Sequence, residues 1–249
     1  MIRNMMLGMG INVRHGEILY DNSGFPTAMI IGSYASNGEK PWTIRGRRVW
    51  IAVALASKRA YNKKWCASTM SQPSCSNAIS AIEIPVVAFK LATSNTGADG
   101  SGNYVSTQST EAHMDQSFTY KNAVKNSKEL TDAILAYNGA MQAAQFCRTI
   151  TLAEFGKMDL PSIDVLMRIY QARTIIDALD PTASANTEMK LSNWGFKQMA
   201  SNWGDNRVYS ASQGGSNTAI PVYFSGKIDT STGKYRPFGV IPVKEIDAR

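Results

Sequence analysis

Apolar positions occur in short runs in the first quarter of the chain, which is the pattern expected of β-strands. Runs at residues 16–20, 28–31 and 48–56 each predict a strand, and the last is rich in β-branched side chains. The Asp-Asn-Ser-Gly sequence at 21–24 predicts a turn after the first strand, because Asn and Gly tolerate a positive φ. We therefore expect the first part of the chain to form a sheet.

The first predicted helical segment starts near Leu130 and reaches Cys147. Small and apolar residues recur in it at helical spacing, with Ser127 or Thr131 as its cap. An Asn-Gly pair at 138–139 interrupts the pattern. Small residues on one face allow such a helix to lie close to a sheet.

The second predicted helix begins at Ser162. The Ser162 hydroxyl is expected to accept a hydrogen bond from a free backbone N–H of the first turn. Asp164 in that turn complements the positive end of the helix dipole. The helix is expected to stop at Asp180, because the proline that follows disfavours helical backbone before it.

Beyond residue 182 the pattern changes to loops and short strands. Strands are predicted at 219–224 and 235–243, and an earlier one within 82–91. Trp194 and Trp203 lie among Asn, Ser and Gly residues, and both are compatible with a place in the core or on an exposed surface.

Composition permits a large core and excludes global disorder. The chain has 249 residues, of which 44% are hydrophobic and 18% charged, with a net charge of +7. The basic residues are scattered, and their densest cluster, at 45–64, is interpreted as a solvated face rather than a nucleic-acid groove. No run of eighteen apolar residues occurs, so we expect no membrane span.

The three cysteines give no disulfide framework, because their number is odd. We expect reduced, inert thiols in a protein folded in a reducing cytoplasm, although a pair between Cys66 and Cys75 stays open. Residues 1–15 are Met-rich and lack the pattern of a signal peptide, so they are interpreted as an attachment arm.

No catalytic, metal-binding or cofactor-binding motif is evident. The two histidines, His15 and His113, lie in no recognisable nucleophile–base arrangement. No phosphate loop or dinucleotide fingerprint is present. Asp99 and its neighbouring asparagines lack the ligand spacing of a calcium loop. We therefore predict no cofactor, no metal and no enzymatic activity.

Three segments in the second half of the chain resemble motifs of a bacterial and phage domain family with the C-type-lectin fold. The family often carries Leu-Pro-Ser/Thr, two residues and Glu-Leu at a helix start, then Trp-Ser-Ser-Thr-Glu, and ends on Val-Arg-Pro-Val. The corresponding segments here are Leu-Pro-Ser-Ile-Asp-Val-Leu at 160–166, Tyr-Ser-Ala-Ser-Gln at 209–213 and Val-Ile-Pro-Val at 240–243. Val165, Tyr209 and Ile241 depart from the family pattern.

The resemblance implies an α+β, C-type-lectin-like fold with mixed or antiparallel sheets, two helices and long irregular loops. It covers about residues 16–244, within a single domain predicted at 16–249 after the arm at 1–15, with an insertion at about 57–125. In this family the two ends of the chain pair as neighbouring strands, and the segment between the second helix and the last strands is an exposed display surface.

By the same resemblance, the protein is expected to be a non-enzymatic bacteriophage virion protein, such as a tail, fibre or capsid-decorating component. Its partners would be a host receptor, glycan or protein, and other virion proteins, with a homo-oligomer, for example a trimer, adding avidity. The alternative is a bacterial surface adhesin of the same fold. An enzyme of the formylglycine-generating type, with Cys147 as its reactive thiol, is a further alternative.

The predicted binding residues lie in the display segment and combine aromatic with adaptable polar side chains. They are Trp203, Asp205, Asn206, Arg207, Tyr209, Gln213, Ser216 and Asn217. We expect the protein to be located in the virion after synthesis in the host cytoplasm or, for the adhesin, on the bacterial cell surface.

Overall fold

The computed structural model describes residues 13–33, 40–44, 46–66, 89–91, 118–120, 126–136, 141–194, 207–213, 218–224, 227–228 and 232–248. Within these ranges the chain is α+β, and its two larger sheets are antiparallel apart from one parallel strand pair. The predicted class is thereby confirmed. Five α-helices lie in the described ranges, where two had been expected.

The first sheet has the strand order β1-β2-β4-β15, and β3 pairs with the first half of β4. Its strands are β1 (Ile18–Tyr20), β2 (Pro26–Ile31), β3 (Trp42–Ile44), β4 (Arg47–Ala54) and β15 (Val243–Asp247). The runs predicted at 16–20, 28–31 and 48–56 therefore correspond to β1, β2 and β4.

Both faces of this sheet are buried, which explains why β2 and β4 read as continuous apolar runs. Met29 and Val53 belong to the core cluster that contains α4 and α5 residues. Ala28 and Ala52, one position away on the same strands, belong to a different cluster. Alternate side chains of each strand thus fill two separate parts of the core.

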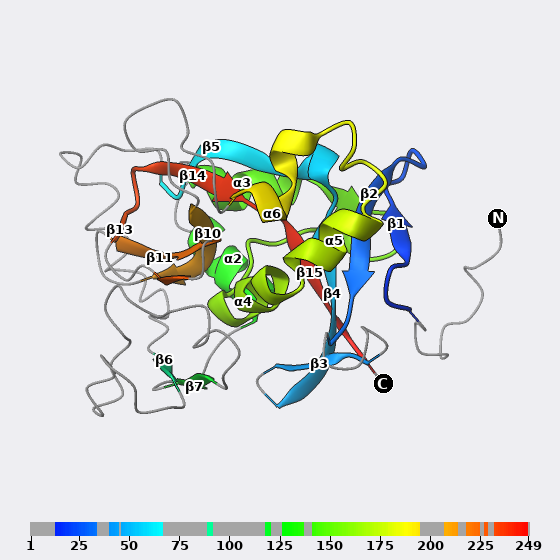
Figure 1. Ribbon diagram of the computed structural model, residues 1–249. Helices are drawn as coiled ribbons and strands as arrows, with labels where there is room; N and C mark the ends of the chain where they lie inside the picture. The colour runs from blue at the N-terminus through cyan, green and yellow to red at the C-terminus, as the bar shows by residue number, and fades with distance from the viewer. Residues whose placement is uncertain are drawn as a thin grey trace.

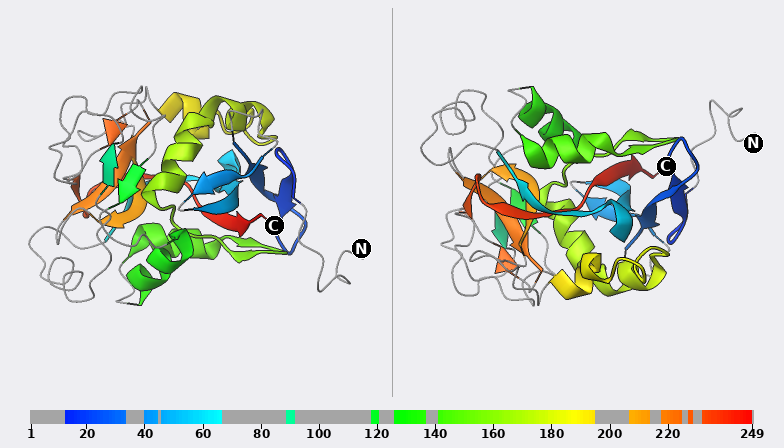
Figure 2. Two further views of the ribbon diagram at one scale, coloured as in Figure 1. Left: turned by 90° about the horizontal axis from the view of Figure 1, so that it is seen from below. Right: turned by 90° about the horizontal axis from the view of Figure 1, so that it is seen from above.

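Helices and a short hairpin cover the two faces (Figure 1). The elements on one face are α4 (Ile163–Gln171), α5 (Arg173–Leu179) and α6 (Leu191–Trp194). Figure 2 shows α2 (Ser127–Leu135), α3 (Gln142–Thr149) and the hairpin of β8 (Thr151–Leu152) and β9 (Gly156–Lys157) on the other. Two 3-10 turns, Ala56–Lys58 and Thr187–Met189, complete this half.

The second sheet has the order β12-β11-β10-β14-β5, with β13 paired to β11. Its strands are β5 (Ala60–Lys64), β10 (Arg207–Gln213), β11 (Thr218–Tyr223), β12 (Lys227–Ile228), β13 (Thr232–Gly233) and β14 (Pro237–Val240). Leu130 of α2 and Cys147 of α3 share a buried cluster with Tyr209 and Val240 of this sheet. The first predicted helical segment therefore packs on the second sheet.

The segment expected as an insertion begins inside the core. Its first strand, β5, pairs with β14, and Trp65 and Cys66 are each 1% exposed. Within the remainder, the structure describes β6 (Phe89–Leu91) and β7 (Phe118–Tyr120), which pair antiparallel. The polar loop predicted at 94–103 lies outside the described residues.

The expectation that the two ends of the chain pair as neighbouring strands is wrong. In the described sheet β1 and β15 lie on opposite sides of β2 and β4. β4 takes the central place because it is eight residues long and pairs along its length with β2, β3 and β15. The strand predicted at 235–243 is divided into β14 and β15, so the chain crosses at Ile241-Pro242 from the second sheet to the first.

The helix ends also differ from the sequence-based expectation. Asn126 rather than Ser127 or Thr131 caps α2, through a capping box with Glu129 in which both reciprocal hydrogen bonds are present. The predicted second helix divides at Ala172 into α4 and α5. Ser162 stands at the N-cap of α4, but its hydroxyl bonds the Asp164 carboxylate and caps no backbone N–H.

Candidate binding site

Three of the eight predicted binding residues lie in the described part of the chain, and all three are on β10: Arg207, Tyr209 and Gln213. The other five, Trp203, Asp205, Asn206, Ser216 and Asn217, lie outside the described residues. For Gln213 the structure gives the backbone, which stands opposite Ala219 of β11.

Tyr209 is a core residue, and its predicted place on an exposed surface is wrong. Its side chain is 0% exposed, and its ring lies 4.9 Å from that of Phe238, centroid to centroid. The hydroxyl donates to the Arg236 carbonyl oxygen at 2.6 Å. Burial raises the pKa of this phenol. The reason is topological: β10 lies between β11 and β14, and α2 packs against it.

Arg207, at the start of β10, is only half-buried. Its guanidinium carbon lies 4.9 Å from the centroid of the Phe238 ring, which is within the range of a cation–π contact. Phe238 therefore stands between Arg207 and Tyr209. Among the predicted binding residues with described side chains, Arg207 is the one that reaches the surface.

The three segments that resemble family motifs are far apart in the sequence and adjacent in the structure. The Ala211 N–H donates to the Pro161 carbonyl oxygen at 2.6 Å, which joins the second segment to the first. Asp159, next to the first segment, exchanges two backbone hydrogen bonds of 2.7 and 2.9 Å with Val243 of the third. The motifs thus meet where the two sheets and α4 come together.

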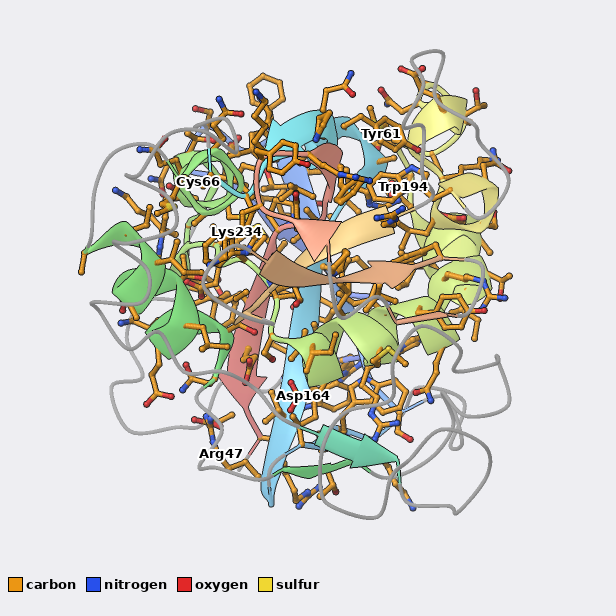
Figure 3. All side chains as sticks on the ribbon, turned by 90° about the vertical axis from the view of Figure 1, so that its left-hand side faces the viewer. Arg47, Tyr61, Cys66, Asp164, Trp194 and Lys234 are labelled. Atoms are coloured by element: carbon orange, nitrogen blue, oxygen red, sulfur yellow. The ribbon has the colours of Figure 1, made fainter. Side chains whose placement is uncertain are left out.

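Close packing at this junction explains why residue 239 is a glycine and why Trp194 is buried. Val208 of β10 pairs with Gly239 of β14, and a Cβ on Gly239 would lie 2.7 Å from the Trp194 ring. Trp194 is 1% exposed, so of the two places considered for it, core or exposed surface, it occupies the core. Its ring centroid lies 4.6 Å from that of Tyr61 (Figure 3). Trp203 lies outside the described residues.

Cys66 is disulfide-bonded, which corrects the expectation of three reduced thiols. Cys147 is free, and Cys75 lies outside the described residues. The Cys66 N–H also donates to the Lys234 carbonyl oxygen at 3.0 Å (Figure 3). The disulfide therefore starts at a point that is already fixed to the second sheet.

Cys147 does not have the surroundings of a reactive thiol. It is 0% exposed on α3, and burial raises its pKa well above the usual value. Since the thiolate is the nucleophile, a buried cysteine with a raised pKa is unreactive at neutral pH. This geometry gives no support to the formylglycine-generating alternative.

A lysine lies buried beside the disulfide, and sequence reasoning missed it. Lys234 is 1% exposed, and its ammonium nitrogen lies 5.0 Å from the centroid of the Trp65 ring. Burial lowers the pKa of Lys234 to about 7, because the charged form loses hydration. Its position in a Thr-Gly-Lys-Tyr turn sequence looks exposed, so no sequence signal indicated this burial.

A second buried cationic side chain, that of Arg59, lies beside two acidic residues at the end of α5. The Arg59 guanidinium is fully buried and lies 3.2 Å from the Asp180 carboxylate and 3.5 Å from that of Asp177. Asp180 also accepts from the Ala56 N–H at 2.7 Å. Arg59 was included in the scattered basic face expected from the sequence, and for this residue that expectation is wrong, because its partners are more than a hundred positions away.

Further properties of the described residues concern metals and membranes. No group of three or more histidine, cysteine or acidic side chains in this part of the chain has a geometry that could hold a metal ion. Within the same residues no helix is long and apolar enough to cross a membrane.

Comparison of the chain with family models, curated proteins and solved structures finds no significant match in any of the three. The family resemblance therefore rests on the sequence segments alone.

Proposed function

We propose that this protein is a non-enzymatic structural or attachment protein of a bacteriophage virion. It would be a tail, fibre or capsid-decorating component whose C-type-lectin-like domain meets a host receptor or another virion protein. The observation that carries the proposal is the convergence of the three motif-like segments, joined by the Ala211–Pro161 and Asp159–Val243 hydrogen bonds. Segments that define one domain family are expected to meet in its core.

The surroundings of β10 favour a rigid base for the binding segment. β10 is paired on both sides, and its residues Val208 to Ala211 are fully buried. Trp203, Asp205 and Asn206 precede this strand in the chain, and Ser216 and Asn217 follow it. Binding residues supported by a rigid scaffold lose less conformational entropy on binding. With Tyr209 in the core, these five residues, Arg207 and Gln213 remain the proposed contacts.

The proposal is tested with particles from the replicon that encodes the chain. Mass spectrometry of purified particles is expected to detect the protein. Particles that carry Trp203→Ala together with Asn206→Ala are expected to assemble normally and to adsorb to host cells at least tenfold more slowly, since removal of central contacts typically costs more than about 1.4 kcal/mol.

The matched control is Ser184→Ala, which changes an exposed residue in the turn after α5. Normal adsorption of the control is required. Normal adsorption of the double variant, with intact particles, would remove these residues from receptor binding. Particles that fail to assemble would indicate a structural role in the virion. Absence of the protein from purified particles would contradict the whole proposal.

A bacterial surface adhesin of the same fold is the second candidate, and the disulfide at Cys66 favours it. Disulfides persist mainly in exported proteins, because the cytoplasm keeps thiols reduced. Fractionation of the bacterium that encodes the chain separates the two candidates. Protein on the surface of uninfected cells, accessible to added protease, supports the adhesin and contradicts the virion protein.

A further inference from the structure

We propose that a hollow between the β1–β2 turn and the start of β8 binds one ring of a neutral saccharide. The hollow has a volume of about 250 Å³ and is lined by three separate segments of the chain. These are the turn after β1, Lys58 of the first 3-10 turn, and the Thr149–Thr151 junction between α3 and β8. This site goes beyond the virion proposal and does not depend on it.

The hollow lies far from β10. In Figure 1, β1 and β2 are at the opposite end of the molecule from β11 and β13, and both views of Figure 2 agree. The same views place the β8–β9 hairpin beside the β1–β2 turn, and the Ala153 N–H donates to the Tyr20 carbonyl oxygen at 2.9 Å. No residue of the predicted binding segment lines this hollow.

The walls of the hollow are held in place by local hydrogen bonds. The Asp21 carboxylate accepts from the backbone N–H groups of Ser23 and Phe25 at 2.9 and 3.0 Å. Gly24 completes the turn with a φ of 81°, a conformation that favours glycine. The Leu55 N–H donates to the Thr27 carbonyl oxygen at 3.0 Å, which fixes the turn to the end of β4. A site that is already ordered needs little reorganisation to bind.

The polar groups of the lining match a ligand that both donates and accepts hydrogen bonds. Within the described part of the chain, the side chains of Asn22, Ser23 and Thr151 form no hydrogen bond to another residue. The Thr149 hydroxyl donates to the Phe146 carbonyl oxygen at 2.7 Å, so its oxygen can still accept. Amide and hydroxyl groups together suit the neighbouring hydroxyls of a sugar ring.

The charges of the lining favour a neutral ligand. Its two charged side chains, Lys58 and Asp21, have opposite signs, and their nearest charged atoms are 3.8 Å apart. An anion would meet the Asp21 carboxylate and a cation the Lys58 ammonium, so either would gain little. The volume is also below the range of about 300–1,000 Å³ typical of drug-sized ligands, which suits a single ring.

Two exposed aromatic residues border the lining in the sequence. Tyr20 is 51% exposed and immediately precedes Asp21, and Phe25 is 63% exposed and lies between Ser23 and Thr27. Only one other large apolar side chain in the described residues, Leu179, is similarly exposed. Aromatic rings next to a few polar groups provide apolar contact area with oriented hydrogen bonds.

The test uses the purified, ¹⁵N-labelled full chain and does not require virions. Glucose, galactose, mannose, fucose and N-acetylglucosamine are titrated separately to about 50 mM, with sialic acid as the anionic comparator. At least one neutral sugar is expected to shift the backbone resonances of residues 21–27 and 149–153. Thr151→Val, which keeps the shape and removes the hydroxyl, and Asn22→Ala are each expected to weaken that affinity about tenfold.

Ser184→Ala is again the matched control and is expected to bind like the unchanged protein. Urea unfolding of each variant shows whether lost binding reflects lost folding. The proposal is overturned if no neutral sugar shifts these resonances, if the folded Thr151→Val and Asn22→Ala variants both bind normally, or if sialic acid binds more tightly than every neutral sugar. Because virion assembly plays no part, these outcomes are independent of the virion proposal.

Discussion

The two ends of the molecule differ in whether their aromatic side chains are buried or exposed. At the β10 end, Tyr209 and Lys234 are both buried, with exposures of 0% and 1%. At the β1 end, Tyr20 and Phe25 are 51% and 63% exposed. In the sequence, however, Tyr209 stands in the segment rich in Ser, Asn and Gly that looked like a binding surface, and Tyr20 ends an ordinary strand.

The difference shows that composition alone does not locate a binding surface. Tyr209 is buried because β10 has a neighbouring strand on each side and a helix on one face. Tyr20 is exposed because β1 is the edge strand of its sheet and only three residues long. The decisive property is the place of the strand in its sheet, which depends on pairing between distant segments.

Replacing Tyr209 by alanine tests the buried side of this comparison and has the largest expected effect. Tyr209→Ala removes a fully buried ring and leaves a cavity, so we expect the free energy of unfolding to fall by about 3–5 kcal/mol in urea titrations. Tyr209→Phe keeps the ring but leaves the Arg236 carbonyl without this donor, and is expected to cost about 1–2 kcal/mol. A near-neutral Tyr209→Ala would mean that this end is open.

The main strands and helices could be predicted because their signals are local. β2 and β4 appear as apolar runs, since both faces of their sheet are buried. β10 was missed because its Arg-Val-Tyr-Ser-Ala-Ser-Gln sequence is too polar for an apolar run. The pairing of β4 with β15, which places β15 at the edge opposite β1, joins residues more than a hundred positions apart. The ion pair of Arg59 with Asp180 does the same. Such pairings leave no mark on local periodicity.

Reduction of the disulfide, which lies at the same buried end, is expected to have the next largest effect on stability. Without reductant, the unfolded protein is expected to show one reactive thiol, from Cys147, and after reduction three. A disulfide constrains the unfolded chain, so reduction is expected to lower the free energy of unfolding by about 2–3 kcal/mol. Three thiols before reduction would show that Cys66 is reduced, as the odd cysteine count had suggested.

Burial of Lys234 gives the β10 end a pH dependence of stability above about pH 7. Its pKa is about 7 in the folded protein and near 10.5 when unfolded, so between these values the unfolded chain binds more protons. Stability should therefore rise with pH above about 7, and below that pH the full destabilisation is present. Cys147 acts in the opposite direction near pH 9, because its pKa is raised. The informative range is therefore about pH 6–8.5.

Lys234→Met removes the titrating group and keeps most of the side-chain volume. The variant is expected to be more stable than the unchanged protein at pH 6, with the gap narrowing as the pH approaches 8.5, in urea titrations at each pH. A constant gap across this range would show that Lys234 is hydrated and that this end is less closed than its burial indicates.

The candidate sites are harder to predict from the sequence, because their residues come from separate segments of the chain. The hollow at β1 combines residues 21–23, Thr27, Lys58 and residues 149–151, which only the folded chain brings together. The Asp-Asn-Ser-Gly turn was predicted correctly as a turn, but a turn sequence does not show which segments pack beside it. Arg207 is the one predicted contact with a described side chain that is partly exposed, because it is the first residue of its strand.

Tyr20→Ala and Phe25→Ala test the exposed side of the comparison and have the smallest expected effect on stability. Both side chains are mostly in water, so each substitution should change the free energy of unfolding by no more than about 0.5 kcal/mol. Urea titration of these variants and of Tyr209→Ala compares the change in the free energy of unfolding at the two ends. A loss above about 2 kcal/mol in either variant would mean that its ring stabilises the fold. Unchanged stability would leave both rings free to serve a ligand.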